Sequence, residues 1–146
     1  MNRFVLDCSV SAAWCLLDET SEAADRVLER LVDEEALVPA LWLMEMANVL
    51  VMAERRERIT PAYAARAVEL LSALPIRIEP AEPADLDACR LIAREYSLSA
   101  YDAAYLELAQ RAGLPLATMD EALETAAEKG GIPLLLDRCN RSPDDH

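Results

Sequence analysis

Histidine is nearly absent from this chain of 146 residues, and its only copy, His146, is the last residue. The four cysteines form no Cys-x-x-Cys pair and are scattered over Cys8, Cys15, Cys89 and Cys139. Because structural zinc sites combine closely spaced cysteines with histidines, this pattern argues against a zinc site. A chain of this length also buries enough core to need no disulfide framework, so we expect reduced cytoplasmic thiols.

Positive charge is also scarce in this sequence. Lys129 is the only lysine, and 14 basic residues stand against 27 acidic ones, which gives a net charge of -13. Phosphate binding normally uses a basic stripe, so this composition by itself argues against a broad nucleic-acid footprint. The same composition is compatible with the binding of cations or of a basic partner protein.

No apolar run is long enough for a membrane-spanning helix. The most apolar stretch, residues 36–53, is interrupted by Pro39, Glu45 and Asn48, whereas a span needs about 20 apolar residues. The N-terminus carries only a short apolar run before Asp7, which is typical of a strand and not of a signal peptide. We therefore expect a cytoplasmic protein without a membrane segment.

Short apolar segments alternate with segments of helical periodicity along the whole chain. Strands are expected at residues 3–7, 36–38, 77–79, 115–118 and 133–136. Helices are expected at residues 9–17, 21–34, 39–56, 61–74, 83–95, 99–112 and 120–130. This alternation is typical of an α/β fold with a parallel sheet covered on both faces. In the absence of a repeat or linker, residues 1–139 are expected to form a single domain, followed by a frayed tail at 140–146.

Acidic residues stand where such a fold places its ligands. Asp7 ends the first expected strand, and Asp120 follows the fourth by two residues. Open α/β sheets bind ligands beyond the carboxyl ends of the strands, where the strand order reverses. If these two strands are neighbours there, the carboxylates converge, and Glu45 and Asp102 lie on helices that can face the same crevice. Clustered carboxylates raise one another's pKa, and a divalent cation with a preference for oxygen, magnesium or manganese, relieves their repulsion.

Each acid also has a purely structural interpretation. Asp7 and Asp120 are suited to cap the helices that follow them. Asp102 comes three residues after Ser99, in a segment that resembles a capping box. Glu45 is different, because it interrupts an apolar helix and a buried carboxylate without a partner is costly. The structural alternative for Glu45 is a position on a narrow exposed stripe of that helix. Capping therefore explains three of the four acids, each taken alone, but not Glu45.

Four segments resemble the motifs of PIN-domain ribonucleases, and specifically those of VapC-type toxins from toxin–antitoxin systems. The segments are FVLDCSV at 4–10, LWLMEMANVL at 41–50, LSAYDAAYLELA at 98–109 and LATMDEAL at 116–123. They occur in the order and at the separations of that family, and together they cover nearly the whole chain. The resemblance implies a three-layer α/β/α PIN-like fold with a five-stranded parallel sheet.

The resemblance also implies an activity, the magnesium-dependent cleavage of RNA by a toxin, with manganese as an alternative metal. The catalytic and metal-binding acids of the family fall on Asp7, Glu45, Asp102 and Asp120. Its supporting positions fall on Ser9, Asn48 and Thr118. Ser9 and Asn48 have local alternatives, as a helix cap and as a side chain bonded to nearby backbone. A metal-activated water would attack the phosphodiester, which suits a chain without an interior histidine.

The implied partners are an RNA substrate, a cognate antitoxin and a second copy of the chain in a homodimer. The acidic composition is suited to a basic antitoxin segment. One apolar helix offers a surface for the antitoxin or for the second copy of the chain. The alternative for most of its apolar side chains is packing in the core. These side chains are Trp42, Met44, Met46, Val49 and Met52.

Local affinity for RNA would have to come from arginines, whose side chains suit bidentate phosphate contacts. Two groups are available, one at Arg55, Arg56 and Arg58 and one at Arg138 and Arg141. A solvated helix end is the alternative interpretation of the first group.

Two other activities on similar folds are each excluded by one residue. A haloacid-dehalogenase-like phosphatase needs a second Asp two residues after the first, where this chain has Ser9. A response-regulator receiver needs a well-placed late lysine, whereas Lys129 follows a helical run. The remaining alternative is a catalytically silent PIN-like module that only binds a partner, and the complete set of four acids argues against it.

Overall fold

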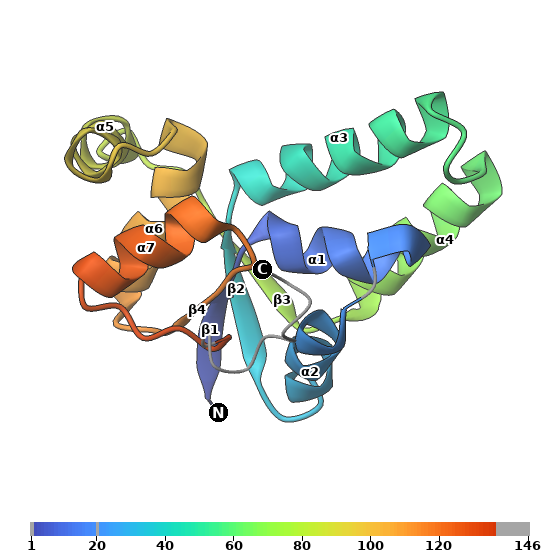
Figure 1. Ribbon diagram of the computed structural model, residues 1–146, viewed down its shortest axis with the longest axis horizontal. Helices are drawn as coiled ribbons and strands as arrows, with labels where there is room; N and C mark the ends of the chain where they lie inside the picture. Colours follow the sequence, from blue (N-terminus) through green and yellow to red (C-terminus); the bar gives the residue numbers. More distant parts are fainter. Residues whose placement is uncertain (1, 20, 137–146) are drawn as a thin grey trace.

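A sheet of four parallel strands lies at the centre of the molecule (Figure 1). The structure, a computed structural model, describes residues 2–19 and 21–136. The strands are β1 (Arg3–Leu6), β2 (Glu35–Pro39), β3 (Ile76–Glu79) and β4 (Leu116–Ala117), in the spatial order β3-β2-β1-β4. Both faces of the two central strands are buried, which is why β1 and β2 read as continuous apolar segments.

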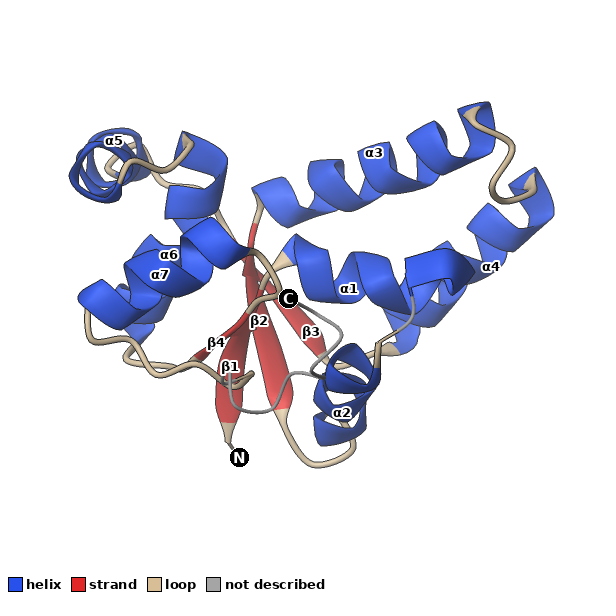
Figure 2. Ribbon diagram, in the orientation of Figure 1, coloured by secondary structure: helices blue, strands red, loops and turns tan. Residues whose placement is uncertain are grey.

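Helices cover both faces of this sheet, as the sequence predicted. They are α1 (Cys8–Cys15), α2 (Glu22–Arg30), α3 (Leu41–Arg55), α4 (Pro61–Ala73), α5 (Asp85–Tyr96), α6 (Ala100–Ala112) and α7 (Glu121–Lys129), with a short 3-10 helix η1 (Leu17–Glu19). Figure 2 shows α6 and α7 on one side of the strands and α1 and α2 on the other. The three-layer α/β/α arrangement is therefore confirmed.

Local signals in the sequence set the ends of α6, the helix that carries Asp102. The Ser99 hydroxyl accepts a hydrogen bond from the backbone N–H of Asp102 at 3.1 Å, so Ser99 caps this helix. Gly113 ends the helix with a φ of 67°, a left-handed conformation that favours glycine. These two residues set where α6 begins and ends.

The prediction of a fifth strand at 133–136 is wrong for the described part of the chain. Only an isolated parallel bridge joins Leu134 to Leu116. Two backbone hydrogen bonds accompany it, from Leu116 N–H to the carbonyl of Pro133 and from Leu135 N–H to the carbonyl of Leu116. Among the described residues these contacts form a single bridge and not a fifth strand.

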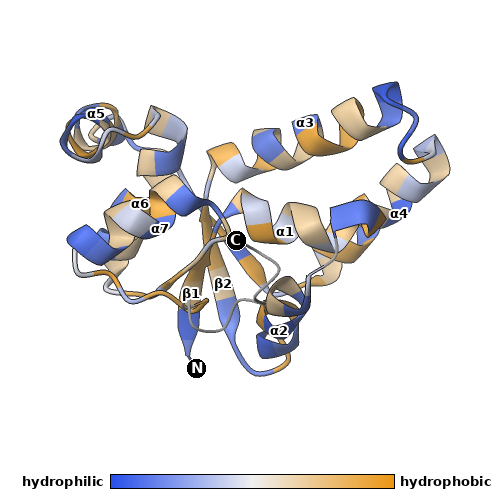
Figure 3. Ribbon diagram, in the orientation of Figure 1, coloured by the Kyte–Doolittle hydropathy of each residue, from blue (hydrophilic) through white to orange (hydrophobic). Residues whose placement is uncertain are grey.

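The apolar stretch that includes α3 is divided between core and surface. Trp42, Met46 and Leu50 are buried, whereas Met44 is 70 % exposed. Figure 3 shows hydrophobic residues along the central strands and hydrophilic residues at the turn between α3 and α4. None of the helices in the described residues is long and apolar enough to cross a membrane. The expected tail at 140–146 lies outside the described residues.

Candidate active site

Strands β1 and β4 meet at the point where the strand order of the sheet reverses. They are parallel neighbours, with Leu6 opposite Ala117, while β2 lies on the other side of β1. Asp7 directly follows β1, and its backbone N–H donates to the carbonyl of Ala117 at 2.9 Å. Asp120 comes three residues after the end of β4. The sheet therefore brings Asp7 and Asp120 to the carboxyl ends of two neighbouring strands, as the sequence predicted.

A hydrogen-bond network holds the carboxylate of Asp7, whose residue is 4 % exposed. Its Oδ2 accepts from the hydroxyls of Ser9 at 2.6 Å and Thr118 at 2.8 Å. The Ser9 hydroxyl accepts in turn from the backbone N–H of Met119 at 2.9 Å. The Thr118 hydroxyl accepts from the N–H of Asp120 at 3.0 Å. The two hydroxyls also lie 3.4 Å from each other, so they link Asp7 to the segment after β4 in one network.

These contacts decide between the structural and functional interpretations of three side chains. Asp7 occupies the position before α1 but makes no side-chain capping bond to that helix. Ser9 likewise bonds across to the segment after β4 and does not act as a simple helix cap. Asp120 does cap α7, because its Oδ2 accepts from the N–H of Leu123 at 2.9 Å. For Asp120 the two interpretations are compatible, since only one carboxylate oxygen serves the cap.

Glu45 lies half-buried on α3 and not on an exposed stripe. Its Oε1 accepts a hydrogen bond from the Tyr105 hydroxyl at 2.5 Å. Tyr105 is fully buried on α6, three residues after Asp102 and therefore on the same face of that helix. Tyr105 was not among the residues predicted from the sequence, because a tyrosine three residues after Asp102 in an apolar helix is typical of a core residue.

The four acids interact electrostatically, and we refer to Asp7, Glu45, Asp102 and Asp120 as the carboxylate cluster. Burial raises the pKa of Asp7, hydroxyl hydrogen bonds oppose that rise, and the charge of Asp120 adds to it. Burial also raises the pKa of Glu45, with further upward contributions from Asp7 and Asp102. The pKa of Asp102 is raised by burial and then by Asp120 and Asp7. Like charges thus raise one another's pKa here, which is common at functional sites.

The donor set of the cluster matches a hard divalent cation. All four acids offer oxygen ligands, which Mg²⁺ and Mn²⁺ prefer, and a cation would relieve the mutual repulsion seen in the raised pKa values of Asp7, Glu45 and Asp102. Within residues 2–19 and 21–136, however, no three Asp, Glu, Cys or His side chains are arranged closely enough to hold a metal ion as they stand. The cluster therefore fits such an ion in its chemistry but is not a preformed cage.

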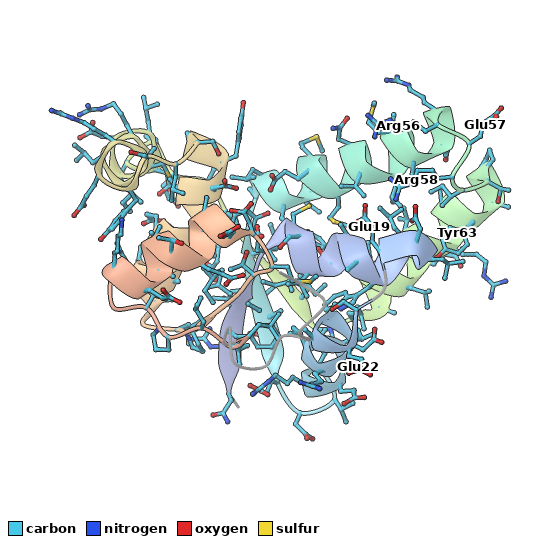
Figure 4. All side chains as sticks on the ribbon, viewed as in Figure 1. Glu19, Glu22, Arg56, Glu57, Arg58 and Tyr63 are labelled. Atoms are coloured by element: carbon cyan, nitrogen blue, oxygen red, sulfur yellow. The ribbon has the colours of Figure 1, made fainter. Side chains whose placement is uncertain are left out.

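The remaining predicted residues lie farther from this network. Asn48 is exposed on α3, one turn after Glu45, and takes no part in the hydrogen bonds around Asp7. Arg56 and Arg58 lie at the end of α3 that points away from the sheet (Figure 4). The arginines expected at Arg138 and Arg141 lie outside the described residues.

Arg58 is engaged in ion pairs with Asp18 at 2.7 Å and with Glu19 at 3.2 Å. Arg55 and Arg56 are exposed beside it. This arrangement matches the solvated helix end that was the alternative interpretation of the arginine group.

The fold and site together define an α/β protein with a parallel sheet and clustered carboxylates at its switch point. A family model described as the PIN domain matches residues 4–129. Ribonuclease VapC3 from Mycobacterium tuberculosis is 34 % identical over 116 residues, which cover 80 % of this chain and 82 % of the relative. The chain therefore belongs to the PIN-domain family, as a VapC-type member.

Solved structures share the fold at lower sequence identity. A crystal structure of a protein from Pyrobaculum aerophilum matches with a TM-score of 0.68 at 23 % identity, covering 86 % of this chain and 84 % of that one. A toxin–antitoxin complex from Klebsiella pneumoniae matches with a TM-score of 0.58 at 21 % identity, covering 80 % and 86 %. At these identities the likeness concerns the fold alone.

Proposed function

We propose that this chain is a magnesium-dependent endoribonuclease and the toxin of a toxin–antitoxin pair. The observation that carries the proposal is the carboxylate cluster at the β1–β4 switch point, with its four acids in electrostatic contact. The name of the relative from Mycobacterium tuberculosis, a ribonuclease, supports RNA as the substrate. Hydrolysis of phosphodiester bonds by a metal-activated water is the reaction that such a donor set serves.

Asp7 and Asp102 are the principal metal ligands in this proposal, with Glu45 and Asp120 binding directly or through water. Mg²⁺, when bound, supplies a water of lowered pKa and neutralises charge that develops on the phosphate oxygens. Mn²⁺ is the alternative metal. The protein contributes orientation, because hydroxyl bonds hold Asp7 and the backbone of α7 holds one oxygen of Asp120. The supporting role of Ser9 and Thr118 is to keep Asp7 in its charged, metal-binding form.

The proposed partners are RNA, a cognate antitoxin and a second copy of the chain. A net charge of -13 makes a basic antitoxin segment complementary to this surface, and the complex from Klebsiella pneumoniae is described as a toxin with its antitoxin. For the homodimer, α3 exposes the apolar side chains of Leu43, Met44 and Val51. Trp42 and Met46 are unavailable to either partner because they belong to the core.

The decisive experiment compares the wild type with Asp7→Asn and Asp102→Asn. Cleavage of several RNAs is measured with Mg²⁺ and with Mn²⁺, and growth arrest is measured on expression in bacteria. We expect metal-dependent cleavage and growth arrest by the wild type and neither by the two variants. If both variants keep full metal-dependent activity, the proposed site is wrong. If the wild type cleaves no RNA with either metal, the alternative of a catalytically silent partner-binding module is favoured.

A further inference from the structure

Tyr105 connects two helices that have mostly different neighbours. Its ring is fully buried in α6, and its hydroxyl donates to Glu45 Oε1 on α3 at 2.5 Å. Helix α3 packs against α1, α4 and β2, whereas α6 packs against α5, α7, β1, β2 and β4. The hydrogen bond therefore sets the position of a cluster carboxylate from the helix that also carries Asp102.

In this contact the Tyr105 hydroxyl donates and Glu45 Oε1 accepts. Burial raises the pKa of the Tyr105 hydroxyl far above its usual value, and the charge and hydrogen bond of Glu45 raise it further. On Glu45 the same bond opposes the rise in pKa that burial causes. It engages Oε1, so Oε2 is the oxygen left for another ligand.

We propose that Tyr105 is a positioning residue that orients the Glu45 carboxylate for metal binding. This inference rests on the proposed function, in which Glu45 is a metal ligand. Groups that hydrogen-bond to metal ligands fix the orientation of those ligands, and their loss typically costs about 10- to 100-fold in metal affinity or activity. Tyr105 would act through Glu45, without touching the RNA.

Tyr105→Phe tests this role because it removes the hydroxyl and keeps the buried ring. Mn²⁺ binding to the full-length, RNA-free protein is measured by isothermal titration calorimetry. We expect the affinity to fall by about 10-fold or more. The Mn²⁺ concentration that gives half-maximal RNA cleavage should rise by the same factor, with activity recovering at saturating Mn²⁺. A residue that serves only stability would leave both metal readouts unchanged.

Tyr63→Phe is the matched control. The Tyr63 hydroxyl also makes one hydrogen bond, to the backbone carbonyl of Cys15 at 2.8 Å, but outside the carboxylate cluster. This variant should bind Mn²⁺ like the wild type. In a Glu45→Ala background, Tyr105→Phe should cause no further loss of Mn²⁺ affinity, because a residue that acts through Glu45 has no effect once Glu45 is absent.

The outcomes separate this inference from the proposed function. A wild type that binds Mn²⁺ and a Tyr105→Phe variant of equal affinity would overturn the role of Tyr105 and leave the proposed function standing. A wild type that neither binds Mn²⁺ nor cleaves RNA would overturn the proposed function itself. If the Tyr105→Phe variant does not fold, a measurement on the wild type tests the inference instead. Mg²⁺ should then shift the ring NMR signals of Tyr105 and not those of Tyr63. Unshifted Tyr105 signals would contradict the inference.

Discussion

The carboxylate cluster and the ion pairs of Arg58 both involve the α3 region, but they combine charges in opposite ways. In the cluster, carboxylates of like charge interact, and Asp7 is only 4 % exposed. Beyond the other end of α3, Arg58 meets Asp18 and Glu19 on the surface of the molecule (Figure 4). Exposed ion pairs contribute little to stability, whereas buried like charges work against it. The difference is the one expected if the cluster serves the proposed function and the Arg58 pairs are ordinary surface contacts.

The largest expected difference between the two regions is in catalysis. Asp7→Asn should lower the rate of RNA cleavage by at least about 100-fold, because loss of a direct metal ligand should cost no less than loss of a supporting residue. Asp18→Asn is the control and should leave the rate unchanged, because Asp18 and its partner Arg58 lie outside the carboxylate cluster. Rates are measured in single-turnover assays at saturating Mg²⁺. An equal loss in both variants would break the distinction between the regions.

The next effect is on stability in the presence of metal. A ligand that binds only the folded protein at about 100 times its Kd stabilises it by about 2.7 kcal/mol. For a chain of this size, that should raise the midpoint of thermal unfolding by roughly 5–10 °C. Asp7→Asn should abolish the rise produced by Mg²⁺, and Asp18→Asn should retain it in full. A rise of the same size in Asp7→Asn would place the ion elsewhere on the molecule.

The stability of the metal-free protein should also depend on pH through the cluster. Because the folded-state pKa values of Asp7, Glu45 and Asp102 are raised, the folded protein holds these protons more tightly than the unfolded chain does. Their contribution is fully present below the usual values of 3.8 for Asp and 4.5 for Glu. It is lost as the pH rises through the raised values.

Thermal unfolding in the presence of a chelator, from about pH 4 to about pH 8, measures this contribution. The stability of the Asp7→Asn variant should fall less steeply with rising pH than that of the wild type. At neutral pH the variant should be more stable by about 0.5–2 kcal/mol. The comparison with the variant separates the effect of Asp7 from that of the overall acidic charge. Parallel curves of stability against pH for the two proteins would contradict a raised pKa of Asp7.

The smallest effect is expected at the surface. Arg58→Ala removes the ion pairs with Asp18 and Glu19, and it should lower the midpoint of thermal unfolding by no more than about 3 °C. High salt should reduce even this difference, because it screens exposed charges. Differential scanning calorimetry at low and high salt checks both statements. A large, salt-independent loss would mean that this contact is structurally more important than its exposure indicates.

Much of the fold was predictable because its signals are local. Ser99 and Gly113 mark the two ends of α6 within their own segment, and the apolar residues of β1 identify a buried strand. The fifth strand was predicted from the same kind of signal and was wrong. A strand there needs a ladder with β4, a separate segment, and among the described residues only a single bridge joins the two.

The candidate site was predictable as a set of residues but not as an arrangement. The resemblance to a known family selected the four acids, and the adjacency of β1 and β4 brought Asp7 and Asp120 to one edge of the sheet. The roles of Ser9 and Thr118 as donors to the same oxygen of Asp7 were not visible in the sequence. Tyr105 was missed because a tyrosine in an apolar helix is normally a core residue, and only its partner distinguishes it.

The sequence by itself determined where the helices and the two central strands lie, and which acids are available, because periodicity and caps depend on neighbours along the chain. Tertiary structure alone decided which of those acids meet and what holds them. The Glu45–Tyr105 bond spans 60 positions and the Asp7–Thr118 bond spans 111. Contacts at such separations depend on strand order and on the packing of helices against the sheet, which no local pattern specifies.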